Sequence, residues 1–222
     1  GLGFSVSSDS GNYMRIANNP TLMYEEHREV NGRILVPGSM GQSRPGALIT
    51  VHLLSKPINY IFNYFNIFSD LINKKVKESL DLGYQIMGVN QTIEDSIPNF
   101  MDLYPTYISF LLLNTLVIFF SFFFYCKSIG LSVFKISSYS QIALWIGIFF
   151  IINDLTKKYF VSPNPGIFNL FAAASTLFAC QLLKKGVDNK NYLIFFSFFF
   201  GFFNLFYEVF ICPYLTFVII FF

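Results

Sequence analysis

The chain has 222 residues, of which 54% are hydrophobic, 20% are aromatic and only 13% are charged. An ordinary soluble domain has about a quarter of its residues charged, so this composition argues against a water-soluble protein and favours one embedded in lipid. The net charge of +2 comes from scattered residues rather than from a dense basic run, and therefore predicts no nucleic-acid partner.

The first polar stretch, "SSDSGNYMRIANNP", contains Asp9. An aspartate followed by serine and glycine is typical of a turn or a helix N-cap. The following "NYMRIANNP" predicts a short helix that ends at its Asn-Asn-Pro sequence. Two interpretations of Asp9 stay open at this point. It is either a capping residue or a carboxylate at the membrane surface that acts as a general base or metal ligand.

Two arginines, Arg33 and Arg44, flank the Gly/Pro/Ser-rich segment "ILVPGSMGQS", which includes Gln42. Arginine is well suited to bidentate contact with phosphate, so this pair fits a site for a lipid diphosphate. The alternative is that both arginines are ordinary anchors for lipid headgroups. The charged cluster just before them, residues 25–29, is expected to be a solvated helix or loop, with metal binding as its alternative.

Residues 47–82 are apolar but interrupted by charges, asparagines and Pro57. Apolar residues recur there at helical spacing, which favours an amphipathic helix lying in the membrane interface. The alternative is a genuine span within 47–69, kinked where Lys56 meets Pro57.

Apolar runs separated by short lysine-bearing loops follow residue 105. The clearest, residues 107–126, is uncharged and long enough to cross roughly 30 Å of hydrocarbon. Further spans are predicted at 136–153, 167–183 and 192–212. Pro213 is expected to break or kink the last of these, with 214–222 a truncated further span or its continuation. The predicted fold is therefore all-α: a polytopic transmembrane helix bundle (106–222) preceded by an extramembrane segment with interfacial helices (1–105).

Lysines in the loops predict the orientation of this bundle, because positive loops face the cytoplasm. The loops after the first and third spans share one side and together hold more lysines than the loop between them. The N-terminal segment is then periplasmic or extracellular, and a bacterial inner membrane is the expected location. Because the chain begins at Gly1 and ends within an apolar run, we expect it to be a fragment of a longer membrane protein.

Glu208 is the only carboxylate inside an apolar run. At membrane depth an ionisable residue is costly and usually functional, whereas near the interface it costs little, and Pro213 is close enough to allow either position. Cys126, Cys180 and Cys212 show no CxxC spacing and no histidine partner. They predict neither a disulfide framework nor a metal site. No cofactor is expected, and a requirement for a divalent metal is left open.

The order of these parts resembles the first external loop of GT-C-type polytopic membrane glycosyltransferases. The likeness covers about residues 5–126 and rests on "SSDSGNYMRIANNP", then "NGRILVPGSMGQSRPGALITVHLLSKP", then an interfacial stretch and spans. The resemblance implies transfer of a sugar from a polyprenyl-phosphate donor. Asp9 would be the base, and Arg33, Arg44 and Gln42 would bind the lipid phosphate. Many members of the family carry an acidic pair at this point, whereas Asp9 is followed by Ser10.

Two other functions stay open. A transporter or flippase fragment would use Glu208 as a coupling residue, and a non-catalytic membrane subunit would use none of these residues. An enzyme should bring Asp9, Arg33 and Arg44 together at the membrane boundary. A transporter should instead place Glu208 in a cavity beside polar partners such as Asn204.

Overall fold

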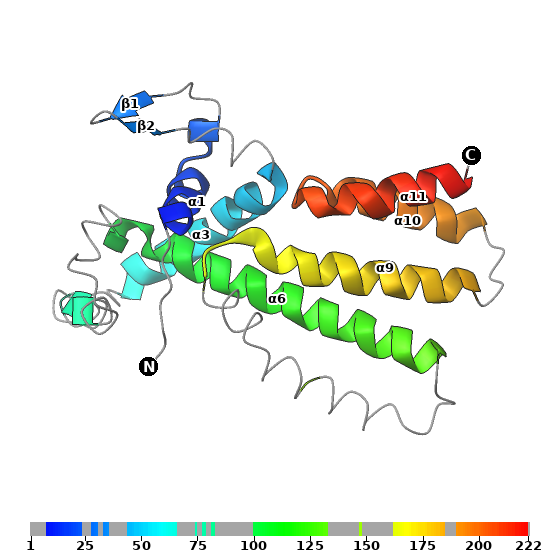
Figure 1. The fold of residues 1–222 in the computed structure, drawn as a ribbon. Coiled ribbons are helices and arrows are strands. Elements are labelled where there is room, and N and C mark those ends of the chain that lie inside the picture. Colours follow the sequence, from blue (N-terminus) through cyan, green and yellow to red (C-terminus); the bar gives the residue numbers. More distant parts are fainter. Residues whose placement is uncertain are drawn as a thin grey trace. The chain divides into compact units, whose positions relative to one another are not determined.

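The computed structural model describes residues 8–23, 28–30, 33–35, 44–65, 100–132, 162–184 and 190–221, with short pieces at 74, 77–78, 81–82 and 147 (Figure 1). These residues are helical apart from one pair of three-residue strands, which confirms the helical class. They fall into two compact units, residues 1–113 with 161–164 and residues 114–160 with 165–222.

The first helix, α1, spans Ser8–Asn18 and is followed by a 3₁₀ turn, η1, at Pro20–Met23. The predicted end at Asn-Asn-Pro is confirmed. Asn19 N–H donates to the Arg15 carbonyl at 3.0 Å, and the Asn19 side chain accepts from the Thr21 hydroxyl at 2.8 Å. Proline then prevents a regular continuation of the helix.

A short antiparallel hairpin joins β1 (Arg28–Val30) to β2 (Arg33–Leu35), with Glu29 opposite Ile34. The helix or loop predicted for residues 25–29 is therefore wrong at Glu29, which lies in a strand. The register leaves only Asn31-Gly32 between the strands, the dipeptide that two-residue hairpins favour. The signal for the hairpin was therefore present in the sequence.

The long helix α3 spans Pro45–Phe65 and continues through Pro57 without a break. It is not among the helices that the described part of the chain offers as membrane spans, so the kinked span is not supported. One face, formed by Ala47, Leu48 and Val51, is buried. Leu53 and Tyr64 on another face are 59% and 72% exposed. An apolar exposed face opposite a buried one suits a helix lying along a membrane surface.

Among the described residues, two helices are long and apolar enough to cross a membrane. The first, α6, spans Phe100–Ser132 and includes the predicted span 107–126. The second, α9 (Phe168–Lys184), follows a 3₁₀ turn, η2 (Pro165–Ile167), and matches the prediction of 167–183. By length and composition they support membrane insertion. The predicted span 136–153 lies outside the described residues except for Gly147.

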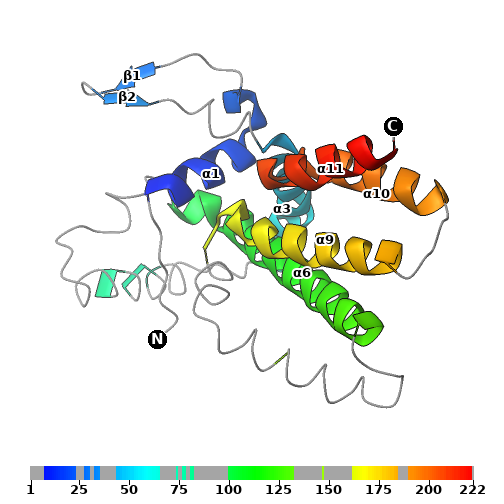
Figure 2. The ribbon, with the colours of Figure 1, turned by 45° about the vertical axis from the view of Figure 1, so that its right-hand side comes forward.

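The last apolar region forms a helical hairpin. Helix α10 (Lys190–Phe203) leads through a turn and the 3₁₀ helix η3 (Glu208–Phe210) into α11 (Ile211–Phe221). Figures 1 and 2 both show α10 and α11 side by side. The predicted span 192–212 with a break at Pro213 is therefore wrong in detail. The break begins at Asn204, and Pro213 lies in the first turn of α11, where its missing N–H needs no partner.

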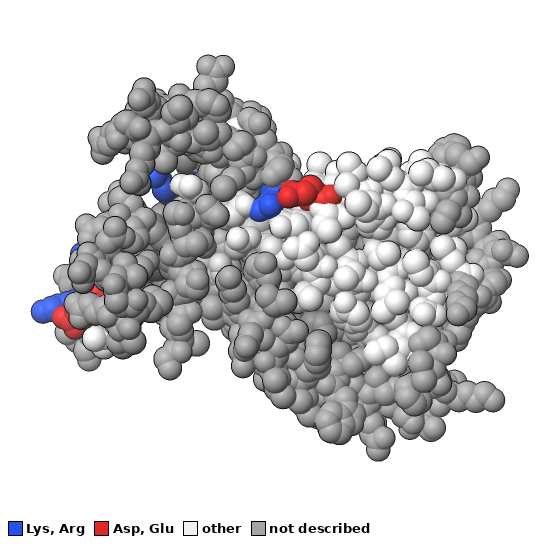
Figure 3. Space-filling model, in the orientation of Figure 1, with Lys and Arg blue, Asp and Glu red and all other residues white. Residues whose placement is uncertain are grey.

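The core of the second unit consists largely of phenylalanine. Ring centroids are 4.6 Å apart for Phe199 and Phe203, 5.0 Å for Phe171 and Phe203, and 5.3 Å for Phe124 and Phe178, so α6, α9 and α10 share one cluster. Tilted and edge-to-face pairs at such distances are the favoured aromatic geometries. Figure 3 shows the outer face over α9, α10 and α11 almost entirely in the colour of uncharged residues.

Candidate functional site

Arg44 is the N-cap residue of α3, because its carbonyl accepts the Leu48 N–H at 3.4 Å. Its Nη1 donates a hydrogen bond to the Tyr13 hydroxyl of α1. Its guanidinium carbon lies 5.5 Å from the centroid of the Tyr13 ring. Tyr13 is only 3% exposed. The arginine is thus fixed against a buried aromatic ring, a geometry in which cation–π attraction adds to the hydrogen bond.

Two further hydrogen bonds hold α1 against α3 and α6. His52 Nδ1 of α3 lies 3.0 Å from the Ala17 carbonyl, which accepts a hydrogen bond from the tautomer protonated at this nitrogen. The Thr106 hydroxyl of α6 donates to Asn18 Oδ1 at 3.4 Å. Carbonyls in the last turn of a helix lack partners within that helix, so the histidine satisfies one of them. These bonds stabilise the position of Tyr13 beneath Arg44.

Asp9 lies in the first turn of α1, where the helix dipole favours a carboxylate. Position 9 is one helical turn before Tyr13, and positions four apart on a helix are neighbours with Cβ atoms roughly 5–6 Å apart. The fold therefore brings the backbone of Asp9 to the same face of α1 as the ring that holds Arg44. The Asp9 side chain lies outside the described atoms.

The other predicted phosphate ligands are not placed in this way. Arg33 opens β2, opposite Val30, and its side chain lies outside the described atoms. Gln42 lies outside the described residues. The structure thus places Arg44 against Tyr13, and leaves Asp9, Arg33 and Gln42 as predictions. Tyr13 was missed, because 31 residues separate it from Arg44 and no local pattern links them.

Glu208 is exposed and opens η3, in the connection between α10 and α11 rather than within a helix. Asn204, where this connection begins, has a buried side-chain oxygen with no hydrogen-bond partner. Backbone N–H groups of the turn donate to carbonyls at the end of α10, at 3.0 Å for Asn204 and 2.9 Å for Phe206. The turn thus satisfies these backbone groups within the chain.

No group of three or more His, Cys, Asp or Glu side chains suited to a metal ion occurs among the residues with described positions. No protein-family model matches the chain, and neither the curated proteins nor the solved structures compared with it gave a match. The likeness to GT-C-type glycosyltransferases remains a prediction from sequence. Any function must therefore be argued from the residues themselves.

Proposed function

We propose that this protein is a polytopic membrane enzyme that transfers a sugar from a polyprenyl-phosphate donor. The observation that supports the proposal is the Arg44–Tyr13 contact, which fixes a guanidinium at the N-terminus of α3 against a ring that lies four residues after Asp9 on α1. A guanidinium is a planar donor fork that matches a phosphate group. A helix N-terminus adds a positive dipole and N–H groups that favour the same anion.

The location of this cluster fits a lipid-linked substrate. The exposed apolar face of α3 ends in Tyr60 and Tyr64, whose rings stack with centroids 6.2 Å apart. Tyrosines of this kind gather at the boundary between hydrocarbon and water. If α3 lies in that boundary, Arg44 is at the same membrane depth as the phosphate groups of the lipids. The lysine bias predicted from the sequence favours the periplasmic side of an inner membrane for this segment.

The chemistry follows from the two charges. Asp9 takes the proton of an acceptor hydroxyl, and the resulting oxygen attacks the anomeric carbon of the donor sugar from the side opposite the phosphate. The bond from that carbon to the phosphate oxygen breaks, and its electron pair leaves on the polyprenyl phosphate. Arg44, with Arg33 and Gln42, stabilises this departing charge. The configuration at the anomeric carbon is inverted.

A second candidate, a transporter or flippase, is favoured by one observation. The connection between α10 and α11 carries Glu208 and the buried, unpartnered oxygen of Asn204. Polar groups at a helix break are typical of transport sites. If this candidate is correct, Glu208→Gln abolishes substrate-coupled flux and Asp9→Asn leaves it unchanged.

The test of the enzyme uses the full chain in vesicles that contain polyprenyl-phosphate hexoses with a radiolabelled sugar. The readouts are release of polyprenyl phosphate and, separately, retention of polyprenyl phosphate by the protein. Asp9→Asn should lower release by about 10²–10⁴-fold and leave binding unchanged. Arg44→Gln should weaken binding by about ten- to a hundredfold, as expected for lost charge-assisted hydrogen bonds. Arg15→Gln, an exposed arginine on the same helix α1, is the control and should change neither. Full release by Asp9→Asn would refute the assignment.

A further inference from the structure

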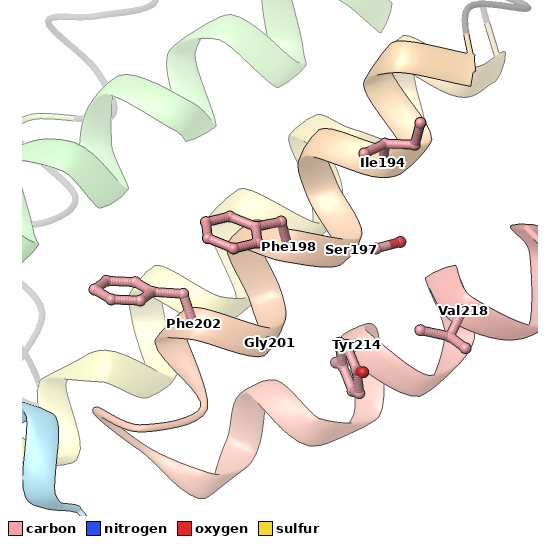
Figure 4. A pocket seen from close by; sticks show the side chains of 7 residues that line it. All are labelled: Ile194, Ser197, Phe198, Gly201, Phe202, Tyr214 and Val218. Carbon is pink, nitrogen blue, oxygen red and sulfur yellow. The ribbon is translucent and has the colours of Figure 1, made fainter.

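A groove of about 450 Å³ lies between α10 and α11 (Figure 4). Its walls are mainly apolar, with Ile194, Phe198 and Phe202 on α10 and Val218 on α11. Two hydroxyl groups, those of Ser197 and Tyr214, belong to its lining. The volume lies within the range of small-molecule sites in proteins, and Phe198 is 75% exposed, so the groove is open at its side.

Gly201 allows the two helices to meet at one end of this groove. A Cβ atom at this position would lie only 3.1 Å from Tyr214 Cε2. Figure 4 shows the helices diverging from that point towards Ile194 and Val218. The groove is thus the space that opens where α10 and α11 separate.

The Ser197 hydroxyl differs from other helical serines of this chain. Ser109, Ser121, Ser128 and Ser175 each donate to the carbonyl four residues earlier at 2.7 Å. Such a bond hides a hydroxyl in an apolar surrounding. Ser197 Oγ is also shielded from solvent, yet it has no hydrogen-bond partner. Buried hydroxyls normally have one, so Ser197 is suited to receive its partner from a bound molecule.

We propose that this groove holds one acyl chain of a diacyl phospholipid, with the ester carbonyl of that chain accepting a hydrogen bond from Ser197. The apolar walls favour binding of a hydrocarbon chain. The Ser197 hydroxyl favours a chain that carries an oxygen able to accept its hydrogen bond. A plain isoprenoid chain has none. Ser197 lies about 10 Å along the helix axis from Lys190, the residue that starts α10 and that is close in sequence to Lys184 and Lys185. Anionic headgroups gather at such lysines, and ester groups lie just below headgroups.

The size of the groove argues against a helix of a second copy as the occupant. The lining residues on α10 run from Ile194 to Phe202, which is about 12 Å along the axis. A helix about 10 Å across would fill roughly 900 Å³ over that length, about twice the volume present. A single extended chain is the better match. This inference depends on membrane insertion and not on sugar transfer.

The test uses the full chain in phosphatidylcholine vesicles that contain a phospholipid with a photoreactive diazirine on one acyl chain. Labelled residues are located by mass spectrometry. The ester-linked lipid should label the helices at the groove, and its ether-linked analogue, which lacks the carbonyl, should label them about three- to tenfold less. Ser197→Ala should lower ester-lipid labelling to the ether level. Ser175→Ala removes a hydroxyl that is bonded within its own helix, and should leave labelling unchanged. Val218→Phe should fill the groove and abolish labelling.

The comparison of ester and ether lipids needs no mutation, so a folding defect does not affect it. Equal labelling by the two lipids in the unmodified chain would overturn the role of Ser197. Labelling that persists in Val218→Phe would show that the lipid lies elsewhere. Absence of labelling at the groove by the ester-linked lipid in the unmodified chain would overturn the proposal. Loss of sugar transfer in any of these variants is a separate result and does not decide the question.

Discussion

Gly201 provides a sharp test of how α10 packs on α11. Substitution by alanine places a Cβ atom 3.1 Å from Tyr214 Cε2 and 3.3 Å from Cδ2. Favourable carbon contacts begin at about 3.5–4.0 Å, so the ring must retreat by roughly 0.4–0.9 Å. Overpacking of this kind costs about 1–3 kcal/mol. Alanine is the better helix former by up to about 1 kcal/mol. We therefore expect Gly201→Ala to lower the free energy of unfolding by about 0–3 kcal/mol.

The sign of the effect should depend on Tyr214. In a Tyr214→Ala background the ring is gone, so Gly201→Ala should keep only the gain in helix propensity and raise the free energy of unfolding by up to about 1 kcal/mol. The difference between the two backgrounds is a coupling energy of about 1–3 kcal/mol. It is measured by unfolding the four variants in mixed micelles with increasing SDS, followed by far-ultraviolet circular dichroism. Equal effects of Gly201→Ala in both backgrounds would refute the close approach.

Two further substitutions test the packing and the helix. Phe200→Ala should lower the free energy of unfolding by up to about 3–5 kcal/mol, because Phe200 is 0% exposed and its ring centroid lies 5.1 Å from that of Phe217. The control is Phe198→Ala, at a side chain that is 75% exposed. Equal losses of stability in the two variants would contradict the phenylalanine core. Pro57→Ala should restore a backbone hydrogen bond inside α3 and raise the free energy of unfolding by up to about 3 kcal/mol. An unchanged free energy of unfolding in the same assay would mean that α3 is not a continuous helix at Pro57.

The helices themselves were largely predictable, because uncharged runs of sufficient length have few alternatives to a helix in lipid. Residues 107–126 and 167–183 were found in this way. The failure at 192–212 has a physical cause. Proline interrupts a helix interior but is tolerated in the first turn of a helix, where Pro213 lies. The actual break begins at Asn204, in an aromatic sequence with little local signal for it.

The candidate site was predictable only in part. Arginine beside a glycine- and proline-rich loop marked Arg44 by residue type alone. The ring that holds it, Tyr13, comes from α1, and this contact arises only when α1 packs on α3. Ser197 was also missed, because in sequence it looks like the serines that bond within their own helices. Its difference lies in hydroxyl orientation, which no periodicity encodes.

The hairpin of α10 and α11 also bears on how the protein is made. Helix α10 has 14 residues, about 21 Å at 1.5 Å per residue, which is shorter than the roughly 30 Å core of a bilayer. As it leaves the ribosome, this segment is therefore too short to be retained as a finished span. Its partner α11 follows only after a turn whose N–H groups donate within the turn and to the end of α10. In a membrane-inserted chain, the pair should therefore pass from the insertion machinery into lipid together, as one closed unit.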